Sequence, residues 1–261
     1  MNTFRVLLPT LLLSTAILRA ADRPNIVFIL ADDLGYTDVS AYGSKYYETP
    51  NIDRLAQEGL KFTNGYTNGP NCQPTPAALI SAQDGPRTGV YTVGNTDRFD
   101  WRSQALRPVD NVATLPADKI TIAQALKSAG YATGLFGKWH LGNKPESHPS
   151  KRGFDEAIES SGKHFDFVTH PKVSYPEGTY LADFLTEKAV DFIERHKDGP
   201  FFLYVPHFGV HSPNQAKPEL TEKFKGKPAA GGHHDPVYAA MIASVDESVG
   251  RITAKLDQLG I

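Results

Sequence analysis

The stretch Ile26-Val27-Phe28-Ile29-Leu30-Ala31-Asp32-Asp33-Leu34-Gly35 decides the fold of this chain of 261 residues. Its first five residues form an unbroken apolar run, which is typical of a strand buried on both faces of a parallel sheet. Two adjacent aspartates follow where that strand ends. Adjacent carboxylates are costly to bury unless a positive group pairs with them, and a divalent cation that prefers oxygen ligands is one such partner. The alternative is an ordinary loop in which one aspartate caps a turn and the other is solvated.

Helices and strands alternate along the rest of the chain. A capping box of Thr121 and Gln124 begins one helix, and apolar residues at helical spacing mark a longer one between Leu181 and Ile193. The patterns predict helices over residues 49–59, 121–130, 181–193 and 236–259, and strands over residues 131–136 and 201–205. This alternation predicts an α/β fold with a mostly parallel central sheet and helices on both faces. In such folds ligands bind beyond the carboxyl ends of the strands.

Polar residues also follow the two later strands. Lys138 and His140 come after the strand at 131–136, and His207 and His211 come after the strand at 201–205. Because the carboxyl ends of parallel strands meet at one edge of a sheet, we expect both pairs to lie near the two aspartates. Each pair also has an ordinary interpretation, since Gly-Lys-Trp-His can form a simple turn and His207 fits a structural histidine. For His211 both the structural and the catalytic interpretation stay open.

The composition excludes two classes of partner. The chain has 27 basic and 29 acidic residues, a formal net charge of -2 and no basic stripe, so neither nucleic acid nor an anionic membrane surface is expected to bind it. Residues 1–21 have the layout of an export signal, with Arg5, an apolar stretch up to Leu18 and the small pair Ala20-Ala21. That stretch is too short to span a membrane. We therefore expect a secreted or periplasmic protein without a membrane span after signal cleavage, in which residues 22–261 form one domain.

Cys72 is the only cysteine of the chain. In an oxidising compartment a single thiol has no partner for an intramolecular disulfide. The residue is therefore either an inert buried thiol or a group with a chemical role.

Six short motifs occur in a particular order. They are Asp-Asp-Leu-Gly at 32–35, Cys-Gln-Pro-Thr at 72–75, Pro-Arg-Thr-Gly-Val at 86–90, Gly-Lys-Trp-His-Leu-Gly at 137–142, Arg-Gly-Phe-Asp at 152–155 and Val-His-Ser-Pro at 210–213. In combination the chain resembles the type I sulfatases, which are formylglycine-dependent members of the alkaline-phosphatase-like superfamily. The resemblance covers nearly all of residues 23–261 and implies the N-terminal catalytic part of such an enzyme.

The resemblance implies a sulfuric ester hydrolase that acts on a sulfated small molecule or carbohydrate. A formylglycine-generating enzyme would oxidise Cys72 to an aldehyde, whose hydrate attacks sulfur and later expels sulfate. Asp32, Asp33 and the modified Cys72 would be metal ligands, for Ca²⁺ or alternatively Mg²⁺. Lys138 would hold the sulfate oxygens. The two histidines at positions 140 and 211 would handle the proton of the diol and that of the leaving oxygen, respectively.

The sequence departs from the family pattern in ways that favour a second interpretation. Pro76 stands where the family has an arginine after the cysteine motif, and Ala82 stands where glycine is usual. We expect a helix over 77–83, with Thr75 extended because it precedes a proline. The remaining metal ligands of the family are expected beyond Ile261, so the domain is interpreted as truncated. An impaired sulfatase-like fragment or pseudoenzyme with an unmodified thiol is therefore the alternative.

Overall fold

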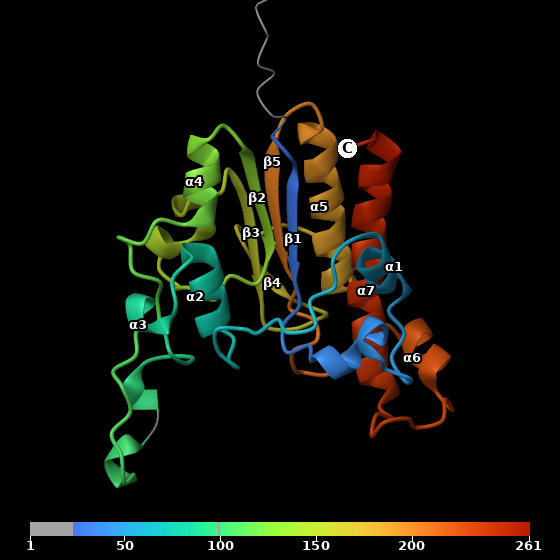
Figure 1. Cartoon of the computed structure of the whole chain (residues 1–261), viewed down its shortest axis with the longest axis horizontal. Coiled ribbons are helices and arrows are strands. Elements are labelled where there is room, and N and C mark those ends of the chain that lie inside the picture. Colours follow the sequence, from blue (N-terminus) through green and yellow to red (C-terminus); the bar gives the residue numbers. More distant parts are fainter. Residues whose placement is uncertain (1–22, 99) are drawn as a thin grey trace, which may run out of the picture.

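The computed structural model describes residues 23–98 and 100–261, so the predicted export signal lies outside the described residues. A five-stranded sheet in the order β1-β5-β2-β3-β4 forms the centre of the molecule (Figure 1). Strands β1, β5, β2 and β3 run parallel, and β4 is antiparallel to β3. The strands are β1 (Ile26–Leu30), β2 (Ala132–Gly137), β3 (Glu156–Ser161), β4 (Val168–His170) and β5 (Phe201–Pro206).

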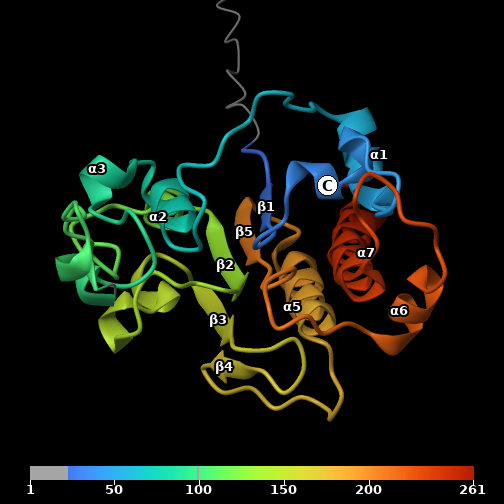
Figure 2. The same ribbon diagram turned by 90° about the horizontal axis from the view of Figure 1, so that it is seen from below.

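Helices cover both faces of this sheet, as Figure 2 shows from below. Helices α2 (Pro74–Ser81) and α4 (Ile122–Ser128) lie on one face, and α5 (Leu181–His196) and α7 (Pro236–Leu259) lie on the other, as the labels of Figure 1 show. The remaining helices are α1 (Pro50–Glu58), α3 (Gly85–Thr88) and α6 (Pro218–Phe224). Short 3-10 helices span Tyr36–Asp38, Ser40–Tyr42, Thr96–Arg98, Trp101–Ser103, Pro145–Ser147 and Pro149–Lys151. In the described part of the chain, none of the helices combines the length and the apolar character needed to span a membrane.

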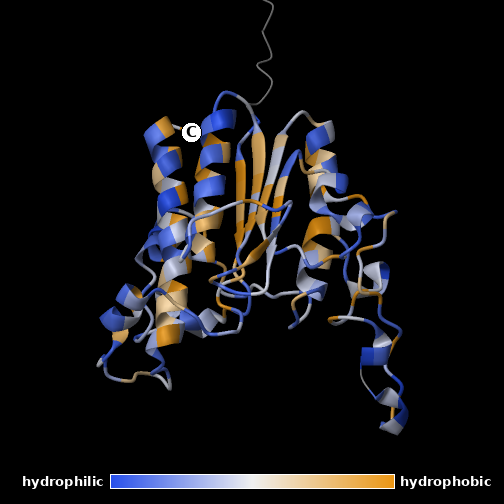
Figure 3. Cartoon of the chain, turned by 180° about the vertical axis from the view of Figure 1, so that it is seen from behind, coloured by the Kyte–Doolittle hydropathy of each residue, from blue (hydrophilic) through white to orange (hydrophobic). Residues whose placement is uncertain are grey.

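The side chains of β5 alternate between two apolar cores because successive residues of a strand point to opposite faces. Leu203 and Val205 pack with Phe192 of α5, whereas Phe202 and Tyr204 pack with Ile80 of α2. All six residues of β5 are buried. The central strands are largely apolar, and the flanking helices turn hydrophilic residues outward (Figure 3). These two cores hold the strands in place. The polar loops begin where the strands end.

Most of the predicted elements are confirmed. The capping box of α4 forms as expected, because the Thr121 hydroxyl accepts from the Gln124 amide at 3.1 Å and the Thr121 amide donates to Gln124 Oε1 at 2.9 Å. Strands β3 and β4 were not predicted. The sequence of β3, Glu-Ala-Ile-Glu-Ser-Ser, is polar and partly exposed, so it lacks the apolar run that identifies β1 and β5.

The expected start of α2 is wrong. The helix begins at Pro74 and ends at Ser81, so Thr75 is helical and not extended. Prolines fit here because the amides of a first helical turn have no intrahelical acceptor. The Thr75 hydroxyl donates to the Gly69 carbonyl at 2.7 Å, and this bond holds the turn that leads into the helix. Pro76 is thus accommodated by the fold.

Candidate active site

The loops that follow β1, β2 and β5 are tied together by main-chain hydrogen bonds. The Asp32 amide donates to the Gly209 carbonyl at 2.9 Å, and the Val210 amide donates to the Asp32 carbonyl at 2.6 Å. The Lys138 amide donates to the Pro206 carbonyl at 2.7 Å. The three loops therefore meet at the carboxyl edge of the sheet, at its lower end in Figure 1. This is the edge at which the sequence predicted a ligand site.

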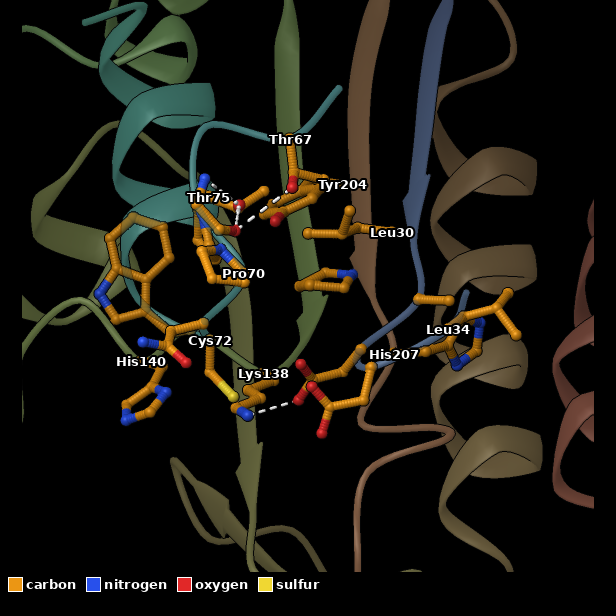
Figure 4. A pocket seen from close by; sticks show the side chains of 18 of the residues that line it. Leu30, Leu34, Thr67, Pro70, Cys72, Thr75, Lys138, His140, Tyr204 and His207 are labelled. Atoms are coloured by element: carbon orange, nitrogen blue, oxygen red, sulfur yellow. Dashed lines mark hydrogen bonds and ion pairs between the residues drawn. The ribbon is translucent and has the colours of Figure 1, made fainter. Parts of the chain in front are cut away.

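A cavity of about 350 Å³ opens at this edge. Figure 4 shows the sulfur of Cys72 beside Lys138, with His140 on its other side. The chemically active side chains that line the cavity are Asp32, Asp33, Cys72, Thr75, Lys138, His140, Tyr204 and His207. The cavity is therefore polar on the side of Cys72.

Lys138 is held by Asp32. Its ammonium forms an ion pair with Asp32 Oδ2, and each side chain is only 14% exposed. The same ammonium lies 5.5 Å from the centre of the Phe208 ring. A positive charge that is partly buried and oriented in this way is suited to binding an anionic oxygen.

Cys72 lies in the turn before α2 and is half-buried. Burial raises the pKa of its thiol, and the nearby carboxylates of Asp32 and Asp33 raise it further. The charge of Lys138 and a hydrogen bond from its ammonium act in the opposite direction without outweighing burial. The unmodified residue is therefore a protonated thiol near neutral pH and a weak nucleophile as it stands.

His140 is neutral at physiological pH. Burial, assisted by the charge of Lys138, lowers its pKa to about 4. Among the described residues its Nδ1 atom has no hydrogen-bond partner. Its backbone has φ +55, which is rare for a residue with a side chain and occurs most often at functional sites. A neutral imidazole of this kind can accept a proton from a neighbouring hydroxyl.

His211 has a defined tautomer. Its Nδ1 lies 2.6 Å from the Ser212 carbonyl oxygen, which can only accept a hydrogen bond, so Nδ1 carries the proton. The Nε2 atom lies 3.8 Å from Asp33 Oδ2. The main chain of this residue is fixed as well, because the His211 carbonyl accepts from His164 Nε2 at 2.7 Å.

His207 fits its structural interpretation. Only 1% of it is exposed, and its Nε2 lies 2.9 Å from the Ser248 hydroxyl on α7. Complete burial lowers its pKa to about 4. It ties the loop after β5 to α7 at the wall of the cavity.

The residues at the cavity fit a divalent cation in part. One donor atom each of Asp32, Cys72 and His211 lie within 4.8 Å of one another. The sequence placed Asp32, Asp33 and Cys72 together, whereas the structure groups His211 with the first and third of these. Calcium takes about six to eight oxygen ligands, so the carboxylates described here supply only part of its shell.

Two positioning residues escaped the sequence analysis. The buried Gln73 side chain donates from Nε2 to the carbonyls of Ala113 and His140, each at 2.9 Å, and thereby ties the cysteine turn to the His140 loop. The Tyr238 hydroxyl on α7 donates to Asp38 Oδ2 at 2.9 Å and lies 3.4 Å from the Asp33 carbonyl oxygen. Gln73 lies next to the motif cysteine, and Tyr238 lies on a helix that packs against a motif. Apart from their polarity, nothing in the sequence indicates a positioning role for either residue.

The chain is similar to known proteins. A family model described as Sulfatase matches residues 24–261. The chain belongs to the sulfatase family. It is 35% identical to human N-acetylgalactosamine-6-sulfatase over 266 residues, a match that covers 93% of this chain and 48% of that protein. It is also 35% identical to a sulfatase of Formosa agariphila over 315 residues, which covers 97% of this chain and 57% of that protein. The chain thus spans about half the length of the curated relatives it matches.

Solved structures confirm the predicted alkaline-phosphatase-like fold. The structure of Ps i-CgsB superposes with a TM-score of 0.77 at 30% identity, covering 92% of this chain and 56% of that chain. The same protein has been solved in complex with k-i-k-neocarrahexaose, with the same TM-score of 0.77 and 31% identity.

Two departures from the sulfatase pattern are visible in the structure. Pro76 lines the cavity and provides neither a hydrogen-bond donor nor a charge. Ala82 ends α2 with φ +53, a left-handed conformation that glycine adopts without strain. Pro76 therefore bears on the chemistry of the cavity, and Ala82 bears on the stability of the fold.

Proposed function

We propose that this cavity hydrolyses sulfate esters, with residue 72 as the nucleophile after oxidation of its thiol to formylglycine by a formylglycine-generating enzyme. The observation that carries the proposal is the position of Cys72. Its side chain faces His140 and Lys138, which is ion-paired with Asp32, in one cavity at the carboxyl edge of the sheet. Membership of the sulfatase family supports the same reaction class.

Each side chain has a role that follows from its protonation state. Lys138, oriented by Asp32, would bind the sulfate oxygens and neutralise their charge. His140 is neutral and would accept a proton from the hydroxyl of residue 72. His211, whose Nδ1 donates to the Ser212 carbonyl, would donate a proton from Nε2 of its imidazolium form to the leaving oxygen. The Asp33 carboxylate at 3.8 Å would stabilise that imidazolium.

A divalent cation is part of the proposal. Asp32, Asp33 and residue 72 would hold Ca²⁺, with Mg²⁺ as the alternative, and His211 lies close enough to influence the site. When bound, the cation lowers the pKa of a hydroxyl and neutralises charge on sulfate. The chain contributes the orientation, because the Asp32 main chain is bonded to Gly209 and Val210.

We propose a sulfated carbohydrate as the substrate. The support is the name of the relatives, N-acetylgalactosamine-6-sulfatase, and the complex of Ps i-CgsB with k-i-k-neocarrahexaose. We further propose that residues 1–21 direct export and that the remainder is the N-terminal catalytic domain of a sulfatase that is secreted or periplasmic.

Pro76 favours a second candidate function, that of an impaired sulfatase. An arginine at this position would place a second cation and several donors at the cavity, whereas the proline ring provides none. The impaired form would retain the anion-binding Lys138 and lack efficient oxidation or turnover at Cys72.

Turnover of 4-nitrocatechol sulfate distinguishes the two candidates. We expect Cys72→Ala to reduce turnover to background and Lys138→Ala to reduce it by about 10²-fold to 10³-fold, as is usual for loss of one stabilising charge. Lys172→Ala, which removes an exposed lysine outside the cavity, is the matched control and should change nothing. A large gain from Pro76→Arg would favour the impaired form. Turnover that is above background and equal in Cys72→Ala and the parent chain would contradict both.

A further inference from the structure

We propose that, as long as Cys72 remains a thiol, the cavity is a zinc site with Asp32, Cys72 and His211 as its three protein ligands. The donor atoms of these residues lie within 4.8 Å of one another and come from three different loops. The proposal concerns the unoxidised residue, so it stands independently of the hydrolytic function. Its chemical consequence is that the oxidation state of residue 72 determines which metal the site prefers.

The spacing is close to that of a tetrahedral zinc centre. Zinc binds sulfur at about 2.3 Å and nitrogen or oxygen at about 2.0 Å, so its ligand atoms are separated by roughly 3.3 to 3.8 Å. Side-chain rotations that move each donor by about 1 Å would bring the observed cluster to these distances. The fourth position would face the cavity of about 350 Å³ and could take a water molecule.

The tautomer of His211 is a separate observation that points to a metal. Histidines that bind metals usually donate their other ring N–H to a carbonyl or a carboxylate, which fixes the ring and exposes the lone pair. His211 does this through the 2.6 Å contact from Nδ1 to the Ser212 carbonyl. Its Nε2 atom lies 3.8 Å from Asp33 Oδ2 and is the ring nitrogen left for coordination.

The charges also balance. Asp32 and Asp33 are anionic, and zinc binding would displace the thiol proton of Cys72 to solvent and leave a thiolate without any change of oxidation state. The three negative charges of Asp32, Asp33 and the thiolate are then balanced by the two positive charges of Zn²⁺ and the one of Lys138. Lys138 uses only Oδ2 of Asp32, which leaves Oδ1 of that carboxylate for coordination.

The donor set discriminates between metals. Thiolate and imidazole favour zinc, whereas calcium prefers six to eight oxygens, which these three ligands do not provide. Oxidation of Cys72 replaces sulfur by oxygen and removes the soft ligand. We therefore expect the thiol form to bind zinc in preference to calcium and the oxidised form to lose this preference.

Cobalt(II) tests the proposal because it substitutes for zinc and reports a thiolate ligand through a charge-transfer absorption band. The probe is Co²⁺ added to chelator-treated protein in which mass spectrometry shows a free thiol at residue 72. We expect one equivalent to bind with that band, Zn²⁺ to displace it, and Ca²⁺ in excess to leave it unchanged.

Two variants and one control complete the test. Cys72→Ser should abolish the band, and His211→Gln should weaken Co²⁺ binding by at least about tenfold. His234→Gln changes an exposed histidine outside the cavity and should bind like the parent chain. Circular dichroism shows whether each variant is folded. A folded thiol form that binds no Co²⁺, or a band that persists in Cys72→Ser, would overturn the proposal, whatever the sulfatase activity.

Discussion

Replacement of the buried His207 by glutamine should make the chain less sensitive to acid. His207 is completely buried, which lowers its pKa in the folded state to about 4, whereas an unfolded histidine titrates near 6.5. As the pH falls below about 6.5, the unfolded chain binds a proton that the folded chain cannot, so stability is lost in this window and levels off below about 4. The two pKa values correspond to a loss of about 2 kcal/mol between pH 7 and pH 5.

Glutamine is the right replacement because its amide can occupy the position of Nε2, which lies 2.9 Å from the Ser248 hydroxyl. It keeps the hydrogen bond and removes the titration. Urea unfolding of metal-free protein at both pH values should show that the acid loss of His207→Gln is smaller than that of the parent chain by about 2 kcal/mol. The exposed His234→Gln should behave like the parent chain. An identical acid loss in His207→Gln and the parent would show that the residue is not buried in its neutral form.

Three further outcomes are expected. Ala82→Gly should stabilise the chain by about 1 kcal/mol in urea unfolding, because φ is +53 there, whereas Ala78→Gly inside the same helix should destabilise it; a loss of stability in Ala82→Gly would contradict this reasoning. Tyr238→Phe removes the hydroxyl beside the Asp33 main chain and should weaken Ca²⁺ binding by the oxidised protein by about tenfold, whereas the exposed Tyr42→Phe should not; unchanged affinity would refute a positioning role. All five residues of β1 are partly exposed, so the chain should bind a hydrophobic dye or self-associate, and a cooperative monomeric transition without dye binding would count against this.

Elements with strong local signals could be predicted from the sequence. Three examples are the apolar run of β1, the capping box of α4 and the helical spacing of α7. Each is a pattern of neighbouring residues, and the structure contains the element that it predicts. Strand β3 could not be predicted, because a polar strand near the sheet edge is defined by its partner β2 and not by its own residues. Proline rules failed at Thr75 because a hydrogen bond to Gly69 holds the helical turn.

The candidate site divides in the same way. The convergence of Asp32, Lys138 and His211 follows from the rule that parallel strands end at one edge, so it could be predicted. The pairing of Lys138 with Asp32 depends on side-chain rotamers, which no sequence pattern encodes. The proton on His211 Nδ1 likewise depends on a single contact with the Ser212 carbonyl. The contacts of Gln73 to two distant carbonyls are likewise visible only in three dimensions.

The proposed function depends most directly on the chemical state of residue 72 in protein made together with a formylglycine-generating enzyme. Mass spectrometry of the peptide spanning residues 61–87 gives the fraction of Cys72 converted to the aldehyde, and turnover of 4-nitrocatechol sulfate by the same samples gives the activity. The proposal predicts that turnover rises in proportion to the converted fraction and is absent from the thiol form. Turnover by protein that contains only the thiol, or none by fully converted protein with Ca²⁺ present, would contradict it.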